Sequence, residues 1–223
     1  MVKATQYSAA HLINEAGVDP ERWNRSPPES EIQETIRAIE ARNVRLIRAN
    51  DGDEALMIIQ GLVPPGSEVM NGSSTTLVEI GFEQYLQGRK SGWSDLHLSI
   101  TKENNTEKRA DLRRRSVSAD YFLSGVNAIA RTGELVGCDL TGSRVGAWPF
   151  AARKLILVSG INKIVPTLSD ALERIREYVY PLESARAQHA YGVPSRIGKC
   201  VIVAYETVPD RITLVLVNDT LGY

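Results

Sequence analysis

The stretch "KLILVSGINKIV", residues 154–165, decides the fold class. Its residues 155–158 form a continuous apolar run, which is typical of a strand buried on both faces of a parallel sheet. The segment that follows, residues 167–187, has the spacing of a helix, with Thr167 or Ser169 as its N-cap and Pro181 near its end. A strand followed by a helix indicates an α/β unit.

Working outward, the same alternation recurs along the chain. Residues 31–50 predict an amphipathic helix that ends near Asn43 or continues to Asn50, residues 67–70 a short strand, and residues 74–87 helical spacing. Near the other end, "KCVIVAYE" and "RITLVLVND" predict two strands that pair as a hairpin across "TVPD". We therefore predict an α/β fold with a mostly parallel open sheet flanked by helices. Residues 1–50 are expected to be a helical segment packed on the main domain, which comprises residues 51–223.

Composition excludes several function classes. The 223 residues carry a formal net charge of −1, and 24% of them are charged, so no global field favours nucleic acid or an anionic membrane. No apolar run approaches the roughly 20 residues of a membrane span. Two cysteines make no disulfide framework, and the three histidines are far apart and show no metal-ligand spacing. The sequence predicts a cytoplasmic protein with reduced thiols and no metal site.

The stretch "NGSSTT" joins a predicted strand to a predicted helix. Ligands of open α/β sheets bind outside the carboxyl ends of strands, where backbone N–H groups and hydroxyls can hold an anion. The other interpretation is an Asn-Gly turn with Ser/Thr capping, and the pattern alone favours neither. The candidate ligand-binding residues here are Asn71, Gly72, Ser73, Ser74, Thr75 and Thr76.

Two later segments carry further candidates. In the glycine-rich residues 124–147, Glu134 or Asp139 is a candidate general base and Arg144 a clamp for a carboxylate. Asn127 and Thr141 are the neighbouring polar candidates, although a hairpin with solvated polar tips explains the same pattern. After the best strand come Asn162 and Lys163, where Lys163 either faces an anionic substrate or is a solvated lysine at a strand exit.

Three stretches together resemble the LUD-domain family, named for lactate utilisation. They are "MNGSSTTLVEIGF" (70–82), "ADYFLSGVNAIARTGELVGCDLTGSRVGAWPFAARKLILVSGINKIV" (119–165) and "RITLVLVNDTLGY" (211–223). The resemblance covers roughly residues 30–223. It implies a fold like that of coenzyme A transferases, ribose-5-phosphate isomerase and glucosamine-6-phosphate deaminase, in which a loop like "NGSSTT" holds phosphate or cofactor. The "NGSSTT" stretch is therefore expected to be a ligand cradle.

The resemblance also implies a chemistry and partners. Family members are linked to lactate oxidation beside iron–sulfur partner proteins. Related isomerases have an acidic residue near position 127, where this chain has Asn127, so Asp120, Glu134 and Asp139 stay as candidate bases. Many similar proteins have several cysteines near the C-terminal end, but here only Cys200 is kept, and one thiolate cannot hold a cluster that takes about four ligands. We expect no cofactor and no iron–sulfur cluster in this chain.

The sequence thus predicts a protein that binds a small anionic organic molecule in lactate or organic-acid utilisation. One alternative is a non-catalytic subunit of a lactate-oxidising complex, and another is a sugar-phosphate isomerase or coenzyme A transferase-like enzyme. Self-association into a homo-oligomer is compatible with each of these functions.

Overall fold

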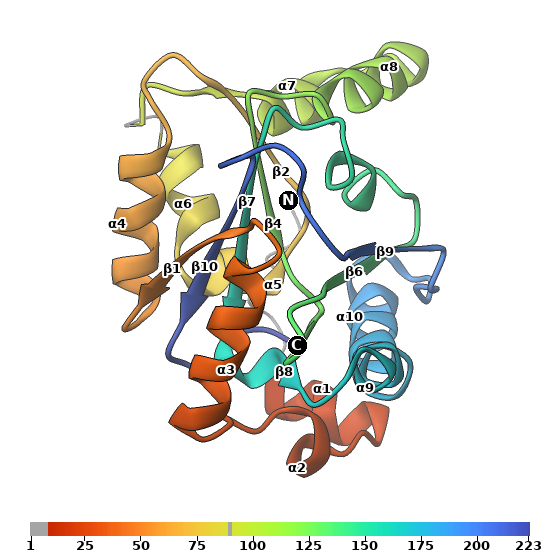
Figure 1. Cartoon of the computed structure of the whole chain (residues 1–223). Helices are drawn as coiled ribbons and strands as arrows, with labels where there is room; N and C mark the ends of the chain where they lie inside the picture. The colour runs from red at the N-terminus through yellow and green to blue at the C-terminus, as the bar shows by residue number, and fades with distance from the viewer. Residues whose placement is uncertain (1–8, 89–90) are drawn as a thin grey trace.

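A six-stranded parallel sheet forms the centre of the molecule in a computed structural model, which describes residues 9–88 and 91–223 (Figure 1). Its strands, in spatial order, are β1 (Arg45–Ala49), β10 (Ile212–Val217), β7 (Lys154–Gly160), β4 (Tyr121–Gly125), β2 (Glu68–Asn71) and β3 (Ser94–Asp95). Every neighbouring pair is parallel. The predicted α/β class with a mostly parallel open sheet is confirmed.

The central strands are apolar because both faces of this sheet are covered. In β7, Leu155 and Leu157 belong to one core cluster, whereas Ile156 and Val158 belong to the cluster on the opposite face. The pattern follows from the two-residue period of a strand. Because β7 is buried on both faces, its residues form a continuous apolar run instead of alternating with polar ones.

Helices cover the sheet on one side and at one end. The first face is covered by α4 (Gly52–Leu62), α5 (Thr75–Glu79) and α6 (Phe82–Gln87), and α7 (Leu96–Lys102) and α8 (Thr106–Ser116) lie at the top in Figure 1. Gly81 separates α5 from α6 with a φ of 75°, a left-handed conformation that suits glycine. The helical spacing of residues 74–87 is thus divided between two short helices. Within the described residues, no helix is long and apolar enough to cross a membrane.

The second face of the six-stranded sheet is covered by a smaller sheet and by α3 (Glu29–Glu40). The smaller sheet has the order β8 (Ile164–Val165), β5 (Ala128–Ala130), β6 (Leu135–Asp139) and β9 (Lys199–Val203). Trp148, near the 3₁₀ turn η1 (Val145–Ala147), fills the space between the sheets; a Cβ on Gly137 would lie 2.7 Å from its ring. Small residues in β6 therefore make room for a fully buried indole.

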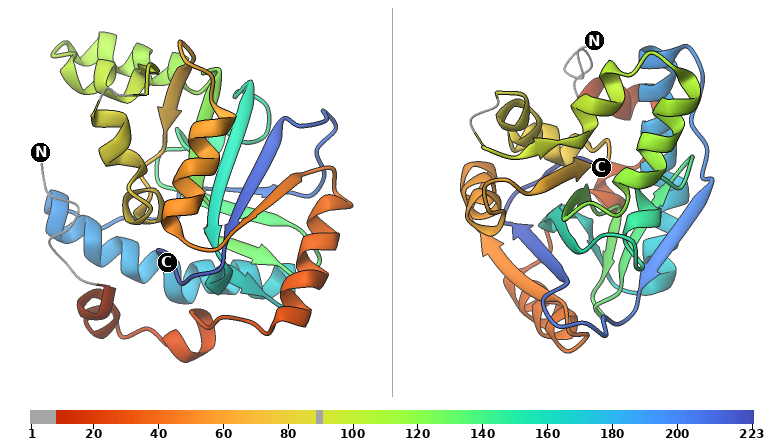
Figure 2. Two further views of the ribbon diagram at one scale, coloured as in Figure 1. Left: turned by 90° about the vertical axis from the view of Figure 1, so that its left-hand side faces the viewer. Right: turned by 90° about the horizontal axis from the view of Figure 1, so that it is seen from above.

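An outer helical layer covers the smaller sheet (Figure 2). It contains α1 (Ala9–Ala16), α2 (Pro20–Trp23), α9 (Leu168–Arg174), the π-helical turn η3 (Ile175–Val179) and α10 (Tyr180–Tyr191). A capping box of Thr167 and Asp170 begins α9, so Thr167 is the N-cap of the two predicted candidates. Pro181 does not end the helix, because it lies in the first turn of α10, where a missing N–H is tolerated.

The structure corrects two other predictions. Residues 199–206 and 211–219 do not form a hairpin: β9 joins β6 in the smaller sheet, and β10 lies inside the parallel sheet between β1 and β7. The helix in residues 31–50 ends at Glu40, and residues 45–49 form the edge strand β1. The segment expected to be helical therefore contributes a strand to the main sheet, and the division at residue 50 stays a prediction.

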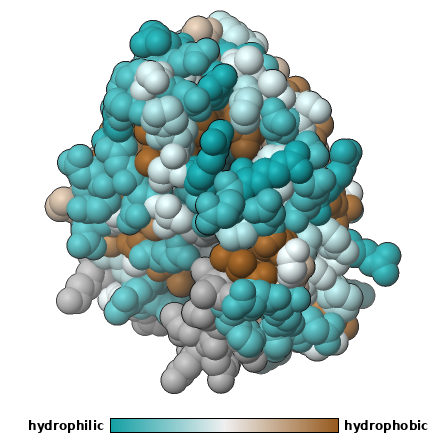
Figure 3. Space-filling model, turned by 90° about the horizontal axis from the view of Figure 1, so that it is seen from below, coloured by the Kyte–Doolittle hydropathy of each residue, from teal (hydrophilic) through white to brown (hydrophobic). Residues whose placement is uncertain are grey.

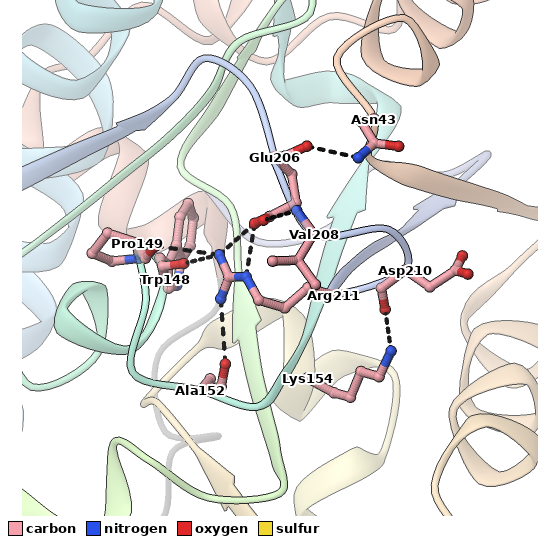
Figure 4. Close-up of polar contacts among 9 residues, drawn as sticks. All are labelled: Asn43, Trp148, Pro149, Ala152, Lys154, Glu206, Val208, Asp210 and Arg211. Carbon is pink, nitrogen blue, oxygen red and sulfur yellow. Dashed lines mark hydrogen bonds and ion pairs between the residues drawn. The ribbon is translucent and has the colours of Figure 1, made fainter.

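A buried ion pair holds the connection between β9 and β10 in place (Figure 4). The Arg211 guanidinium contacts the Glu206 carboxylate at 2.5 Å and donates to the carbonyl oxygen of Trp148 at 2.7 Å. Asn43, just before β1, donates to the Glu206 carbonyl oxygen at 2.7 Å. This network lies at the amino ends of β7 and β10, so it fixes the end of the sheet opposite the candidate site.

Candidate functional site

The candidate site lies where β2, β4 and β7 end. Asn71, Gly125 and Gly160 are the last residues of these three parallel strands, so their carboxyl ends meet at one edge of the sheet. The "NGSSTT" loop follows β2, and the 3₁₀ turn η2 (Ile161–Lys163) follows β7. In open α/β sheets this edge is where ligands bind.

Lys163 is the central side chain of this edge. Its exposed fraction is 1%, which rules out a solvated lysine at the strand exit. Its Nζ donates to Thr76 Oγ1 at 2.7 Å and to the Val126 carbonyl oxygen at 3.1 Å. Burial, together with the positive charges of Arg174 and Arg144 and against the opposing charge of Glu79, lowers the pKa of Lys163 to about 7.

Arg144 approaches the same edge from the loop after β6. One of its terminal nitrogens donates to the Gly125 carbonyl oxygen at 2.7 Å, and the other donates to Asn127 Oδ1 at 2.9 Å and to the Cys138 carbonyl oxygen. Burial lowers the pKa of the guanidinium from its ordinary value. All these acceptors are neutral, so Arg144 links β4, the connection from β4 to β5, and β6 without an opposite charge beside its guanidinium.

Arg174, on α9, was not a candidate from the sequence. It is completely buried; it donates to the carbonyl oxygens of Trp23 (2.9 Å) and Asn127 and lies against the Tyr178 ring. Its Nη2 has no hydrogen-bond partner among the described residues. Burial lowers its pKa to about 10. The signal was its position on the apolar stripe of the helix, between Ala171 and Tyr178.

The "NGSSTT" loop combines the two interpretations that its sequence leaves open. Ser74 is the N-cap of α5 and accepts from the Leu77 N–H at 3.3 Å, as the capping interpretation predicts. Thr76 instead presents its hydroxyl to Lys163. Asn71 is buried and donates to Glu83 at 3.4 Å, whereas Ser73 is exposed.

Glycines set how closely the loop is packed. A Cβ on Gly72 would lie 2.4 Å from Arg144 Cγ, and a Cβ on Gly125 would lie 2.3 Å from Ser74 Oγ. The backbones of β2 and β4 therefore approach these side chains more closely than any larger residue would permit.

Residues 219–223 run across the same edge and alongside α10 (Figure 2). The Leu221 N–H donates to Asn162 Oδ1 at 3.2 Å, and the Gly222 N–H donates to Glu79 at 2.6 Å. The Asn162 amide is buried and also donates to Asn24 Oδ1 at 2.7 Å. Asn162 thus holds both this segment and the segment after α2.

A cavity of about 80 Å³ lies beneath this segment. Its lining comprises Leu12, Ile13, Asn24, Glu79, Tyr178, Leu182, Thr220, Gly222 and Tyr223. Gly222 separates it from Lys163, since a Cβ there would lie 3.2 Å from Lys163 Nζ and within 2.8 Å of the hydroxyls of Thr75 and Thr76. The cavity is therefore one glycine away from Lys163.

The three candidate bases lie apart from one another. Asp139 caps the turn after β6, accepting from the N–H groups of Gly142, Arg144 (2.9 Å) and Val145 (3.0 Å). Glu134, at the other end of β6, forms an ion pair with Arg42. Asp120 precedes β4, at the opposite edge of the sheet.

These three carboxylates already have structural partners. Asp120 accepts from the Glu68 N–H at 3.2 Å and is 3.5 Å from an Arg153 nitrogen.

Thr141, a ligand-binding candidate, is exposed and lies 2.9 Å from the Ser143 hydroxyl. The structure brings together Thr76, Asn127, Arg144 and Lys163 from the predicted set, but not Glu134, Asp120 or Thr141.

Comparisons with known proteins agree with this architecture. A solved structure, described as a DUF162 family protein from Deinococcus radiodurans, has a TM-score of 0.51 and 12% identity over 86% of this chain and 99% of its own. That likeness concerns the fold alone. Among curated proteins, none matches this chain. The family model described as LUD domain matches residues 32–217, which include the strands and loops of the candidate site, and the chain therefore belongs to the LUD-domain family.

Proposed function

We propose that this protein binds a small organic anion at the carboxyl edge of the six-stranded sheet, with Lys163 and Arg174 as its charge partners. The observation that carries the proposal is a group of buried cations with neutral partners. Lys163, Arg144 and Arg174 donate to hydroxyl, amide and carbonyl oxygens, and none of them forms an ion pair in the part of the chain that the structure describes.

Buried cations that lack carboxylate partners are costly, because desolvation is not offset by an opposite charge. Such costly arrangements and the perturbed pKa values that accompany them cluster at functional sites. Arg174 adds a buried nitrogen that has no hydrogen-bond acceptor, which an oxygen of an anion would supply. Since α5 has only five residues, the side-chain cations supply most of the positive potential, and the helix dipole supplies little.

The small cavity favours a small ligand. Pockets for drug-sized molecules measure roughly 300–1,000 Å³, and this cavity measures about 80 Å³. A carboxylate of a few carbon atoms fits this size better than a coenzyme. Such a ligand agrees with the role in lactate or organic-acid utilisation that the family implies.

The geometry supports binding more directly than acid–base catalysis. Asp139 caps a turn, Glu134 pairs with Arg42, and Asp120 lies at the opposite edge. The group at this edge that exchanges a proton near neutral pH is the Lys163 amine. An anion beside it would favour the protonated amine, so binding should be accompanied by proton uptake.

The test is calorimetric titration of the full chain with L-lactate, pyruvate, glycolate, inorganic phosphate and ribose 5-phosphate. Repeating each titration in two buffers of different ionisation enthalpy measures the number of protons taken up. We expect one of the small carboxylates to bind and to raise the free energy of unfolding by about 2.7 kcal/mol at a hundredfold excess over Kd. Binding should involve uptake of up to one proton above pH 7.

Two variants separate a specific site from general charge effects. Lys163→Met removes the amine but keeps the length of the side chain, and it should abolish binding. Lys108→Met removes an exposed lysine on α8 and should leave binding unchanged. If no compound binds, or if the Lys163 variant binds as tightly as the wild-type chain, the proposal is wrong.

A further inference from the structure

A second group of side chains with ligand chemistry lies between α1 and α10. His11 and Glu15 are one helical turn apart on α1, and positions i and i+4 share one face of a helix. His189 is on the last turn of α10, which packs against α1 (Figure 2). The three residues are far apart in sequence, which is why the spacing of histidines along the chain does not reveal the group.

The three side chains converge closely. His189 Nε2 lies 2.7 Å from Glu15 Oε2, and His11 Nε2 lies 3.6 Å from the same oxygen. Each residue offers one ligand atom, and these atoms lie within 4.8 Å of one another. Among the described residues, no other three His, Cys, Asp or Glu side chains come together in this way.

Two imidazoles and one carboxylate are a donor set that suits zinc. Bonds of about 2.1 Å in tetrahedral geometry place neighbouring ligand atoms roughly 3.4 Å apart. The separations of 2.7 Å and 3.6 Å from Glu15 Oε2 lie on either side of this value, and the two histidine ligand atoms lie within 4.8 Å of each other, so side-chain rotations would bring the three atoms to bonding distance. All three residues are exposed, which leaves room for water to complete the coordination.

Binding an ion here would connect two elements that wall the cavity. Leu12 and Ile13 of α1 and Leu182 of α10 line it. With eight residues, α1 is shorter than the roughly 12 to 15 residues that an isolated helix needs in water, so its order depends on packing. An ion held by both helices would fix α1 against α10.

We propose that His11, Glu15 and His189 form a binding site for a divalent transition-metal ion, Zn²⁺ by preference, that joins α1 to α10. Figure 3 shows the face that carries α1 and α2 to be largely hydrophilic, with apolar residues visible between the polar ones. The site does not depend on the organic anion, because its residues are separate from Lys163 and Arg174.

The test is titration of the tag-free, full-length chain with Zn²⁺ and, in parallel, with Co²⁺, whose visible absorption reports nitrogen and oxygen coordination. We expect one ion per chain and a rise in the melting temperature. Binding should weaken in acid, because protons compete with the metal for the ligand atoms. No organic ligand is added.

Variants on both helices make the result specific. His11→Ala and His189→Ala should each weaken Zn²⁺ binding by ~10-fold or more, and each should abolish the Co²⁺ spectrum. The matched control is His97→Ala on α7, which should bind as the wild type does. The proposal is overturned if the wild-type chain binds no Zn²⁺, or if the His189 variant binds it as tightly as the His97 variant.

A structural measurement completes the test. Hydrogen exchange of the α1 amides should slow when Zn²⁺ is added to the wild-type chain and should not change in the His189 variant. Unchanged exchange in wild type with one ion bound would contradict the joining of α1 to α10.

Discussion

The ε-amine of Lys163 donates to Thr76 Oγ1 at 2.7 Å, which joins the turn after β7 to the first turn of α5. The two residues come from loops that follow separate strands of the parallel sheet, yet they meet because those strands end at the same edge. The contact places a buried amine against a hydroxyl and not against a carboxylate. A buried amine without a carboxylate partner should make the stability of the protein depend on pH.

The first prediction concerns Lys163 and pH. The folded-state pKa of Lys163 is about 7, below its ordinary 10.5, so between these values the unfolded chain binds a proton that the native chain does not. This group should therefore raise the free energy of unfolding between pH 7 and pH 10, by up to about 1.4 kcal/mol per pH unit. Below pH 7 the amine is protonated in both states, so the group adds no pH dependence there. Urea unfolding across the range from pH 7 to pH 10 measures the rise.

Lys163→Met is the variant that tests this cause. It removes the cost of burying the amine but also two hydrogen bonds, so at pH 7 we expect a net gain in stability of about 1–3 kcal/mol. The rise in the free energy of unfolding between pH 7 and pH 10 should be smaller in Lys163→Met than in the control variant Lys108→Met. A Lys163 variant with the same pH dependence as wild type would show that another group is responsible.

The second prediction concerns the packing of Gly72 against Arg144. In Gly72→Ala the new Cβ would lie 2.4 Å from Arg144 Cγ, so the guanidinium must move away from Gly125 and Asn127. We expect a loss of about 1–3 kcal/mol in unfolding free energy, measured by urea, and weaker anion binding.

The control for Gly72 is Gly61, in the last turns of α4. Nothing lies within 4 Å of a Cβ at Gly61, so Gly61→Ala should stabilise the helix by about 0.5–1 kcal/mol and leave binding unchanged. Equal effects of the two substitutions would argue against a specific role for the close approach at Gly72.

The third prediction concerns the ion pair of Arg211 and Glu206. Removing one partner of a buried pair leaves an uncompensated charge, so Arg211→Ala should cost about 3–5 kcal/mol in urea unfolding. Replacing both residues, as Met and Leu, should cost less than the single change. Arg114→Ala, which breaks an exposed pair with Asp111, should change stability by less than about 1 kcal/mol.

The same pair predicts a dependence on acid. Burial alone would raise the pKa of Glu206, but hydrogen bonds from Arg211 and from the Val208 N–H lower it below its ordinary value. Its contribution to stability is therefore present at neutral pH and is lost as the pH falls through the lowered pKa. A double variant should be less sensitive to acid between pH 5 and pH 3 than the wild type, roughly the range in which carboxylates titrate; equal sensitivity would assign acid unfolding to other carboxylates.

The fourth prediction concerns Cys138 and Cys200, which are directly opposite each other on antiparallel β6 and β9. Opposed residues have Cα atoms roughly 4.5–5.5 Å apart, within the range of disulfides. The exposed Cys200 should attack oxidised glutathione, forming a mixed disulfide and releasing one reduced glutathione; the Cys138 thiolate then attacks the Cys200 sulfur and releases the second.

The second step should be slow, since burial raises the pKa of Cys138 to about 12 and little thiolate is present. Mass spectrometry should show loss of two hydrogens, faster at higher pH, and Cys138→Ser should stop at the mixed disulfide. Persistence of the mixed disulfide in the wild-type chain would mean that the two thiols cannot meet.

Local apolar patterns predicted the strands but not all their neighbours. The runs in β7 and β10 identify buried strands because both faces are covered, a property that each strand carries in its own residues. The pairing of β10 with β1 and β7 depends on segments far away in the chain, and the short "TVPD" connection suggested a hairpin. Pairing is non-local, so a turn pattern was insufficient evidence.

In the candidate site, too, some residues could be predicted from local patterns and others depend on distant segments. The meeting of Lys163 with Thr76 could be predicted because polar residues after parallel strands gather at one edge, whereas Arg144 reaches this edge from the loop after β6 of the smaller sheet. Arg174 could not be assigned there, since its role depends on the packing of α9 on the smaller sheet. The ion pair of Glu134 with Arg42 likewise depends on the turn after α3, a segment 92 residues away in the sequence, which the pattern around Glu134 does not describe.

The amide of Asn162 has a consequence for the order of folding. It binds Asn24 and Leu221, which lie 138 and 59 residues away in the sequence, so one side chain closes two long loops. Loop-closure entropy opposes such non-local contacts early in folding, and both contacts also need η2, which follows β7 of the parallel sheet, to be in position. We therefore expect these two contacts, which hold the segments around the anion site, to be among the last to form during refolding.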